Sequence, residues 1–369
     1  MRLSGLGAHS LSILSSTLTH SCSSILLRKH VCTRRPSCSN PGSHCHEKLY
    51  TVTVVGAAGG IGQPLSLLLK SNAHIGRLNL FDVAPSVTGV VMDISHVDTP
   101  AIVHGYSGKD KLADALKGSD VVVSVAGVTL KPGQSRDDLF SINCSILKGI
   151  ASGIADHCPQ ALVAVVSNPV NSLVPLVLEV MLAKGVKEAE KRVFGVCTLD
   201  VMRASVFASQ LLNVSASDVK MPVIGAHSGP TIIPVASRCE PQLVFSKIDD
   251  LNAFHTRVQS AGHEVLTAKE GKGTATLSMA YAAARFTTSL LRALSGHDVV
   301  ECAFVKSHVT SASFFSNELL LGRHGVKRNL GLGPLAPDEE ARVAACLPEL
   351  KQQIAKGEQV PGLLRQSCC

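Results

Sequence analysis

The chain has 369 residues, of which 45% are hydrophobic and 17% are charged, a balance that is typical of folded enzymes and excludes global disorder. Its net charge of +7 is unevenly distributed, because residues 1–48 contain six basic residues and one acidic residue. The rest of the chain has few excess basic groups and no basic stripe of the kind that binds nucleic acid. No apolar run approaches membrane-spanning length. The sequence therefore predicts no nucleic-acid partner and no membrane partner.

Residues 1–48 are predicted to be a disordered targeting peptide that precedes the folded part. The segment is rich in Ser, Arg and Leu and lacks acidic residues before Glu47, which favours import into mitochondria. One alternative stays open, because Arg2-Leu3, five residues and then His9-Ser10 nearly match an amino-terminal peroxisomal signal.

The cysteines indicate no disulfide framework and no metal site. Four of the twelve fall inside the targeting segment, and no pair in the rest has Cys-x-x-Cys spacing. We therefore expect free thiols and no bound metal.

The stretch Tyr50–Gly62 predicts a dinucleotide-binding turn. Residues 51–55 form a β-branched run that is typical of a strand buried on both faces, and a helical pattern follows the glycines. Gly56 permits a sharp turn, Gly59 leaves room for a pyrophosphate, and Gly62 allows the helix to pack closely. The helix N-terminus then offers free N–H groups to the phosphates.

A second apolar run, Arg77–Asp82, ends in a carboxylate twenty residues after Gly62. A dinucleotide fold needs an acidic group there to accept hydrogen bonds from the hydroxyls of the adenosine ribose. Because a carboxylate repels a 2′-phosphate, Asp82 favours NAD over NADP. The competing interpretation is an ordinary turn residue at the end of a strand.

Strands and helices alternate as far as Phe194, which predicts a Rossmann-type, doubly wound parallel sheet of the α/β class. We assign residues 49–196 to this NAD-binding domain and residues 197–365 to a carboxyl-terminal α+β catalytic domain. The carboxyl ends of the strands, where ligands gather in such sheets, are followed by loops at 126–136 and 167–171.

The second half is expected to contain helices near 200–212, 251–265 and 274–294, and strands near 301–307 and 311–315. A terminal helix should begin near Asp338 and kink or restart at Pro348.

Three residues downstream of the nucleotide fold suit hydride transfer to a 2-oxo acid. Such a reaction needs a base for the hydroxyl proton, for which His227 is suited, and a carboxylate such as Asp200 to fix its tautomer. It also needs a guanidinium, for which Arg203 is suited, to hold the substrate carboxylate. Taken singly, each could equally be a surface or turn residue, and their joint occurrence after the nucleotide fold favours function.

At this point the sequence resembles the malate dehydrogenases of the lactate/malate dehydrogenase family, of the mitochondrial and bacterial NAD type. The resemblance covers residues 49–357 and rests on five segments: Gly56–Lys70, Arg136–Phe140, Ser167–Ser172, Thr198–Val201 and Ala275–Ala282. It implies a two-domain fold, a homodimer, NAD as cofactor and a small 2-oxo or 2-hydroxy acid, malate or oxaloacetate, as substrate.

The resemblance also implies roles for individual residues. His227 would exchange the proton, Asp200 would be its partner, and Arg203 would clamp the substrate's C1 carboxylate. Arg136 would polarise the substrate carbonyl, and Asn168 would contact the substrate. The cofactor would lie against residues of the glycine turn and of the strand ends: Gly56, Ala57, Ala58, Gly59, Gly60, Ile61, Gly62, Asp82, Asn143, Val166, Ser167, Asn168 and Met279.

One position departs from the family pattern. The family's loop normally reads Val-Pro-Arg-Lys-Pro-Gly-Met-Thr-Arg, and its first Arg pairs with the distal carboxylate of malate, whereas Leu130 stands there in this chain. Losing a charge-assisted pair of ~2–4 kcal/mol would weaken binding of a dicarboxylate, unless Lys131 compensates with a flexible ammonium. Two alternatives stay open: a dehydrogenase that prefers apolar or aromatic 2-oxo acids, and a catalytically silent NAD-binding paralogue.

Overall fold

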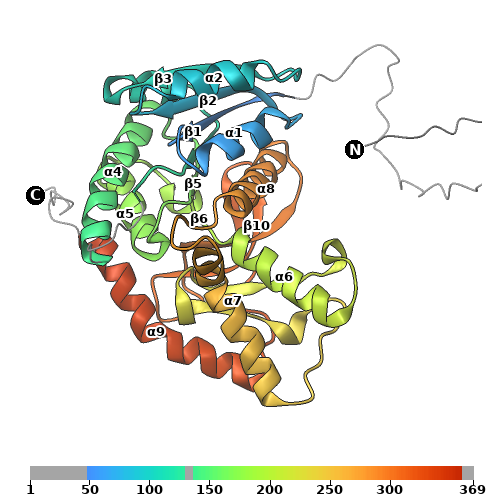
Figure 1. Ribbon diagram of the computed structural model, residues 1–369. Coiled ribbons are helices and arrows are strands. Elements are labelled where there is room, and N and C mark those ends of the chain that lie inside the picture. The colour runs from blue at the N-terminus through green and yellow to red at the C-terminus, as the bar shows by residue number, and fades with distance from the viewer. Residues whose placement is uncertain (1–47, 129–135, 360–369) are drawn as a thin grey trace, which may run out of the picture. The chain divides into compact units, whose positions relative to one another are not determined.

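The structure is a computed structural model that describes residues 48–128 and 136–359, without the side chains of residues 136–138 (Figure 1). These residues belong to one compact unit that begins at Glu47. Within the described part, the strands form a single 11-stranded sheet. Residues 1–47 of the predicted targeting segment and Leu130 lie outside the described residues.

The sheet has the strand order β3-β2-β1-β4-β5-β6-β9-β10-β7-β8, and β11 pairs with β10. The first six strands in this order are parallel neighbours, and β9 then pairs antiparallel with β6. The parallel strands are β1 (Tyr50–Val55), β2 (Ile75–Asp82), β3 (Ile102–Ser107), β4 (Val121–Ser124), β5 (Leu162–Val165) and β6 (Val193–Val196). The remaining strands are β7 (Val223–Gly225), β8 (Ile232–Pro234), β9 (Val299–Lys306), β10 (Phe314–Gly322) and β11 (Gly325–Asn329).

The helices of the nucleotide-binding half are α1 (Gly62–Lys70), α2 (Val87–Ser95), α3 (Leu112–Leu116), α4 (Arg136–His157) and α5 (Val170–Ala183). Those of the second half are α6 (Thr198–Leu212), α7 (Ile248–Ala268), α8 (Leu277–Leu294) and α9 (Pro337–Glu358). Short 3₁₀ turns lie at Lys109–Lys111, Ala189–Lys191, Ala216–Asp218, Gly229–Thr231 and Ala236–Arg238. The predicted fold class, a doubly wound parallel sheet followed by a mixed α/β half, is confirmed by this arrangement.

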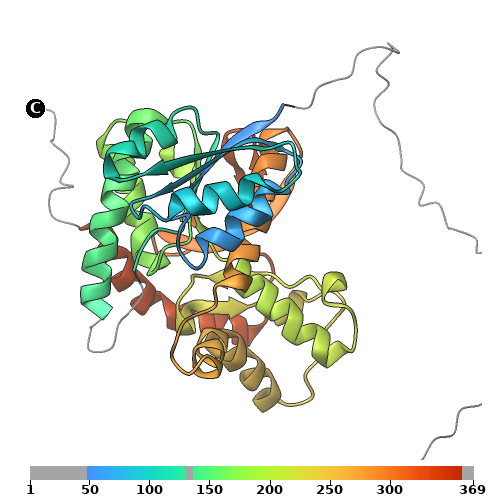
Figure 2. The same cartoon turned by 45° about the horizontal axis from the view of Figure 1, so that its top comes forward.

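Helices cover both faces of the parallel sheet, as its buried strands require. Figures 1 and 2 show α4 and α5 on one face and α1 and α8 on the other. Two large apolar clusters match these layers, since residues of α4, α5 and α9 pack in one and residues of α1 and α8 pack in the other. Helix α8 is tied to α1 through the side chain of Asn72, which donates a 2.8 Å hydrogen bond to Thr288 Oγ1. The second half therefore contributes a covering layer to the nucleotide-binding sheet.

The central strands form because their side chains are apolar on both faces. All residues of β4 and β5 are buried, and β1 buries every residue except Thr51. Such β-branched runs suit a strand that is covered on both sides. Because β1, β4 and β5 are parallel, their carboxyl ends lie at the same edge of the sheet, next to the glycine turn.

Two local predictions in the second half differ from the structure. A strand was expected over 311–315, but β10 begins at Phe314 and continues to Gly322. It pairs antiparallel with both β9 and β11. Of the two alternatives predicted at Pro348, a kink or a restart, the restart does not occur, because α9 runs from Pro337 to Glu358 with Pro348 inside it. Pro348 is exposed, while Val343 and Leu350 are buried, so apolar packing holds the helix together across the proline.

Among the described helices, none combines the length and the apolar character that crossing a bilayer would need.

Candidate active site

The glycine turn closes on its own backbone at the end of β1. Gly56 has a φ of +95°, a conformation that side chains disfavour, and a Cβ on it would lie 2.7 Å from the backbone N of Ala126. A Cβ on Gly62 would lie 2.1 Å from the carbonyl oxygen of Gly56. Gly62 is thus required for the first turn of α1 to approach the turn after β1. Gly59 and Gly60 are exposed and leave their backbone open to a ligand.

Asp82, at the end of β2, lies beside this turn. Its Oδ2 accepts a 2.9 Å hydrogen bond from the backbone N–H of Ala58, and its Oδ1 accepts one of 3.0 Å from Ala84. The carboxylate therefore holds the glycine turn as well as facing it. Its contact with a ribose stays a prediction.

Asn143 ties together two of the predicted loops at the carboxyl ends of the strands. Its Nδ2 donates to the carbonyl oxygens of Asn168 and Val128, at 2.8 and 3.1 Å, and its Oδ1 accepts from the N–H of Val128 at 2.8 Å. Ser167 donates a 2.5 Å hydrogen bond to the carbonyl of Ala126. Both Asn143 and Ser167 are buried, whereas Asn168 is exposed. The first two shape the loops, and Asn168 has a side chain free to meet a ligand.

Other predicted cofactor residues belong to the apolar cluster that packs beside the glycine turn. Ala57, Val166 and Met279 are buried in the cluster that α1 and α8 share, and Ile61 packs against it from the surface. Met279 is part of α8, so the second half contributes to the cluster beside the glycine turn. An apolar surface of this kind suits a flat ring more than a charged group.

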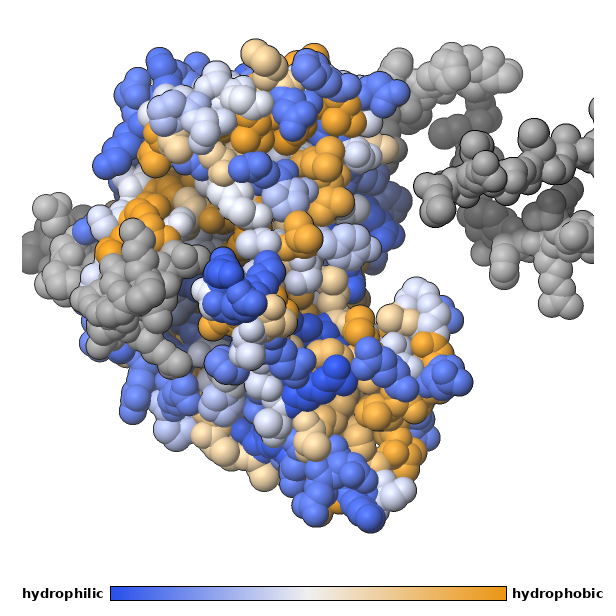
Figure 3. All heavy atoms as spheres, in the orientation of Figure 1, coloured by the Kyte–Doolittle hydropathy of each residue, from blue (hydrophilic) through white to orange (hydrophobic). Residues whose placement is uncertain are grey.

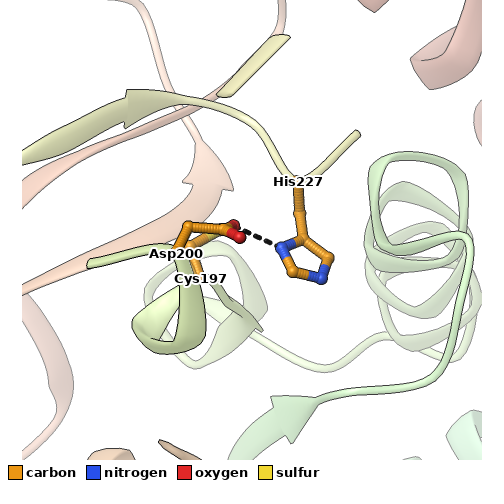
Figure 4. A group of neighbouring side chains, drawn as sticks. All are labelled: Cys197, Asp200 and His227. Carbon is orange, nitrogen blue, oxygen red and sulfur yellow. Dashed lines mark hydrogen bonds and ion pairs between the residues drawn. The ribbon is translucent and has the colours of Figure 1, made fainter. Parts of the chain in front are cut away.

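His227 and Asp200 form a buried dyad (Figure 4). His227 follows β7 and Asp200 lies in the first turn of α6, and Nδ1 of the imidazole is 2.5 Å from Asp200 Oδ2. The Asp200 side chain is fully buried, and that of His227 is 12% exposed. The carboxylate accepts the Nδ1 proton, which leaves Nε2 as the nitrogen that can exchange a proton with a ligand.

The electrostatics of the dyad favour the protonated imidazole. Burial alone would lower the pKa of His227, but the charge and the hydrogen bond of Asp200 outweigh it, so the pKa is raised above 6.5. Arg203 opposes this rise. Its guanidinium lies 3.8 Å from Asp200 Oδ1, and burial lowers the pKa of Arg203 in spite of Asp200 and Glu264. Asp200, Arg203 and His227 thus place a carboxylate, a guanidinium and an imidazole next to one another in a largely buried site.

Asn171 belongs to this site although the sequence analysis assigned it no role. Its Oδ1 accepts a 2.9 Å hydrogen bond from the backbone N–H of His227, and its side chain is buried. The available signal was a polar residue in the first turn of a mostly apolar helix, α5, just after a strand end. Such a residue is more often a helix cap than part of a site, so the pattern alone did not identify it.

Cys197 lies close to the dyad, and donor atoms of Cys197, Asp200 and His227 all lie within 4.8 Å of one another. This triangle does not suit a metal, because Asp200 and His227 bind each other directly. Burial, together with Asp200, raises the pKa of the Cys197 thiol, so the sulfur stays protonated.

Two substrate residues of the sequence analysis cannot be located in the same way. Leu130 lies outside the described residues, and Arg136 begins α4 without a described side chain. Their roles stay predictions.

Over residues 50–195 the chain matches the family model described as lactate/malate dehydrogenase, NAD binding domain, and over residues 197–360 the alpha/beta C-terminal domain of the same family. It is 51% identical to the mitochondrial malate dehydrogenase of Felis catus over 309 residues, which cover 84% of this chain and 90% of that one. The human mitochondrial malate dehydrogenase is 50% identical over 308 residues, or 83% and 90% of the two chains. A lactate dehydrogenase structure from Cryptosporidium parvum, complexed with lactic acid and nicotinamide adenine dinucleotide, is 25% identical with a TM-score of 0.73 and covers 85% of this chain and 99% of that one.

Proposed function

This chain belongs to the lactate/malate dehydrogenase family and is an NAD-dependent dehydrogenase, and we propose that it interconverts malate and oxaloacetate. The observation that carries the proposal is the buried hydrogen bond between Asp200 and His227, with Arg203 beside it. These are the groups that a 2-hydroxy acid dehydrogenase needs. About half of the aligned residues are identical in malate dehydrogenases of mammalian mitochondria. We propose residues 49–196 as the NAD-binding domain and residues 197–365 as the catalytic domain.

The glycine turn fits NAD. A pyrophosphate needs backbone N–H groups without side chains in front of them, and Gly60 provides one next to the start of α1. The N–H of Gly59 donates to the carbonyl oxygen of Gly56 at 3.2 Å, so Gly59 contributes room for the phosphate rather than a hydrogen bond. Asp82, held at the turn by Ala58, is suited to accept hydrogen bonds from ribose hydroxyls. When bound, NAD accepts or supplies the hydride of the reaction.

His227 would hold and release the proton that accompanies the hydride. Because Asp200 occupies Nδ1, the proton for the substrate oxygen comes from Nε2 during reduction and returns there during oxidation. Reduction needs the imidazolium and oxidation needs the neutral ring. Since Asp200 raises the pKa of His227 above 6.5, kcat/KM for reduction should fall as pH rises through that raised pKa, and kcat/KM for oxidation should rise over the same interval.

Arg203 would hold the C1 carboxylate of the substrate, because its fork is pinned beside Asp200 and a planar guanidinium suits bidentate carboxylate binding. By resemblance, Arg136 would polarise the carbonyl and Asn168 would bind the substrate. By the same resemblance, Leu130 would stand where the family has an arginine, so the distal end of the substrate would lack that partner.

The test is a substrate panel at saturating NADH: oxaloacetate, pyruvate, phenylpyruvate and 2-oxoisocaproate. The proposal expects oxaloacetate to be the best substrate, with a kcat/KM that Leu130→Arg raises by roughly 30- to 1,000-fold, the worth of one charge-assisted pair. Better turnover of an apolar 2-oxo acid would replace malate as the assigned substrate. No reduction of any of the four would contradict the enzymatic function itself.

We also propose a homodimer. Six large apolar side chains are more than a third exposed on the neighbouring helices α1, α6 and α8, and Figure 3 shows apolar residues over α1. They are Leu67, Leu68, Val206, Leu211, Leu277 and Tyr281. Single exposed apolar residues are ordinary, but a set on adjoining helices suits a protein interface. Light scattering on the purified protein should give twice the chain mass, and a monomer at micromolar concentration would exclude the dimer.

The matched mammalian relatives are mitochondrial, and we propose that residues 1–48 direct this chain to mitochondria. A reporter fused to this segment should enter mitochondria. A peroxisomal pattern would favour the signal at Arg2-Leu3 and His9-Ser10 instead.

A further inference from the structure

Three hydrogen bonds in series join helix α9 to the loop that carries His227. Gln353 Nε2 donates to Glu349 Oε1 at 2.7 Å, and Asn171 Nδ2 donates to Gln353 Oε1 at 2.6 Å. The backbone N–H of His227 then donates to Asn171 Oδ1 at 2.9 Å. The series runs from the far end of the chain, across α5, to the residue that would exchange the proton.

The direction of this series is fixed at both ends. The carboxylate of Glu349 can only accept, so Gln353 must turn its NH₂ group toward it and its oxygen toward Asn171. At the other end the N–H of His227 can only donate, so Asn171 must turn its oxygen toward it. The middle contact then joins the NH₂ of Asn171 to the oxygen of Gln353, and neither amide can flip without breaking two bonds.

Close packing holds the two helices in this relation. Ser172 Oγ donates a 2.6 Å hydrogen bond to the carbonyl oxygen of Gln353. A Cβ on Gly357 would lie 1.9 Å from the carbonyl oxygen of Ser172, so α9 approaches the first turn of α5 as closely as a glycine allows. Asn171 is 1% exposed, so bulk water does not reach its amide, and the other acceptor near its Nδ2, Thr231 Oγ1, lies at the longer distance of 3.4 Å.

The geometry points to Gln353 as a positioning residue that acts on His227 through Asn171. This inference rests on the proposed function, because it gives a reason for the position of the proton-exchanging loop. Gln353 touches no ligand-facing atom among the described residues. It holds the Asn171 amide so that its oxygen meets the backbone of His227, which keeps the imidazole in line with Asp200.

The first experiment compares Gln353→Met, which keeps the length of the side chain and removes both hydrogen bonds, with Gln352→Met at the adjacent, exposed position. For Gln353→Met we expect kcat of oxaloacetate reduction to fall by roughly five- to tenfold, the worth of about one hydrogen bond, with the KM for NADH unchanged. Gln352→Met should match the native enzyme. Equal kcat in all three proteins would overturn the inference. A Gln353→Met variant in which only the KM for NADH rises would overturn it as well.

Exchange of the two polar ends provides a rescue. Gln353→Glu alone sets two carboxylates against each other and should lower kcat at least as much as Gln353→Met. In Glu349→Gln with Gln353→Glu, the new amide at 349 donates to the carboxylate at 353, which still accepts from Asn171. The double variant should regain most of kcat. A double variant no better than the single one, with equal melting temperatures, would contradict the directional relay.

A measurement without turnover separates this inference from the proposed function. The imidazole of His227 is titrated by NMR in the native protein and in Gln353→Met. The substitution leaves unchanged the polar groups that face the imidazole from α6 and from the residue before it: Asp200, Arg203 and Cys197. A looser loop weakens the Asp200 hydrogen bond, so the pKa of His227 should fall in the variant. If the pKa of His227 is the same in Gln353→Met and in the native protein, the positioning role of Gln353 is excluded, whether or not the enzyme is active. If the pKa falls in the variant but the native protein is inactive, only the proposed function is contradicted.

Discussion

In the nucleotide-binding half the atoms that we propose to face a ligand are mainly backbone atoms, whereas in the second half they belong to ionisable side chains. Gly59 and Gly60 expose main chain at the start of α1, and Asp82 is the one charged group that the sequence assigns to the cofactor. The dyad of the second half instead buries a carboxylate completely and holds an imidazole against it. The first site depends on the absence of side chains, and the second on the charge of those present.

This difference determines how each half should respond to change. A backbone turn tolerates changes of pH but not a Cβ at Gly56 or Gly62, where it would lie 2.7 and 2.1 Å from backbone atoms. A buried charged pair tolerates some movement but not the loss of a partner, since the remaining charge cannot be solvated. Four variants test the contrast, in order of expected effect.

The largest effect is expected for His227→Gln. Turnover of oxaloacetate should fall by roughly 10²- to 10⁴-fold, because proton transfer by a positioned group contributes about that much. The dissociation constant of NADH, followed by fluorescence titration, should stay within about twofold. His297→Gln, at an exposed position on the loop before β9, is the control. Retention of most activity would remove His227 from its role.

Gly62→Ala tests the backbone turn. The new Cβ would lie 2.1 Å from a backbone oxygen, so the start of α1 must move, and NADH should bind about a hundredfold more weakly, or ~2.7 kcal/mol. Gly89→Ala in α2, where a Cβ meets nothing within 4 Å, should leave binding unchanged and add about 0.5–1 kcal/mol of stability. Native affinity in Gly62→Ala would mean that the turn can relax.

His255→Leu tests whether buried ionisable groups give the second half its pH dependence. His255, in α7, is fully buried, and burial, aided by Arg342 and opposed by Asp338, lowers its pKa to about 4. The unfolded chain binds its proton near pH 6.5, so stability contributed by the neutral ring is complete above that pH and is lost as pH falls toward 4.

Between pH 7 and pH 5 the native protein should therefore lose about 2 kcal/mol of unfolding free energy through this residue, a loss that His255→Leu abolishes. Urea unfolding at the two pH values measures it. The exposed His263 of the same helix supplies the control variant, His263→Leu. An identical pH slope in native protein and His255→Leu would contradict the burial argument.

The smallest effect is expected for Asp82→Ser, since Asp82 is partly exposed and solvent screens its charge. The ratio of kcat/KM with NADPH to that with NADH should rise about tenfold, because repulsion of a 2′-phosphate is removed. Asp93→Ser, at an exposed position in α2, should not change the ratio. Equal use of both cofactors by the native enzyme would exclude the role given to Asp82.

Much of the nucleotide-binding half was predictable because its signals are local. The β-branched run, the three glycines and the carboxylate of Asp82 fall within one strand–turn–helix–strand unit, and the apolar run predicted over Arg77–Asp82 lies within β2. The turn geometry follows from contacts between residues six apart, such as Gly56 and Gly62. The chemistry of Asp200, Arg203 and His227 suggested their roles after the nucleotide fold, and family resemblance supported those roles, whereas periodicity and spacing left them open.

Tertiary structure alone decided how the dyad is held. Asn171 and Gln353 are 182 residues apart, and their contact exists only because α9 packs against the first turn of α5. Likewise, the long β10 arose from pairing with β9 and β11, which outweighs the local pattern that ended a strand at Phe315. A side-chain amide has no preferred partner until packing removes water from around it, so the sequence can show that Gln353 is polar but not what it holds in place.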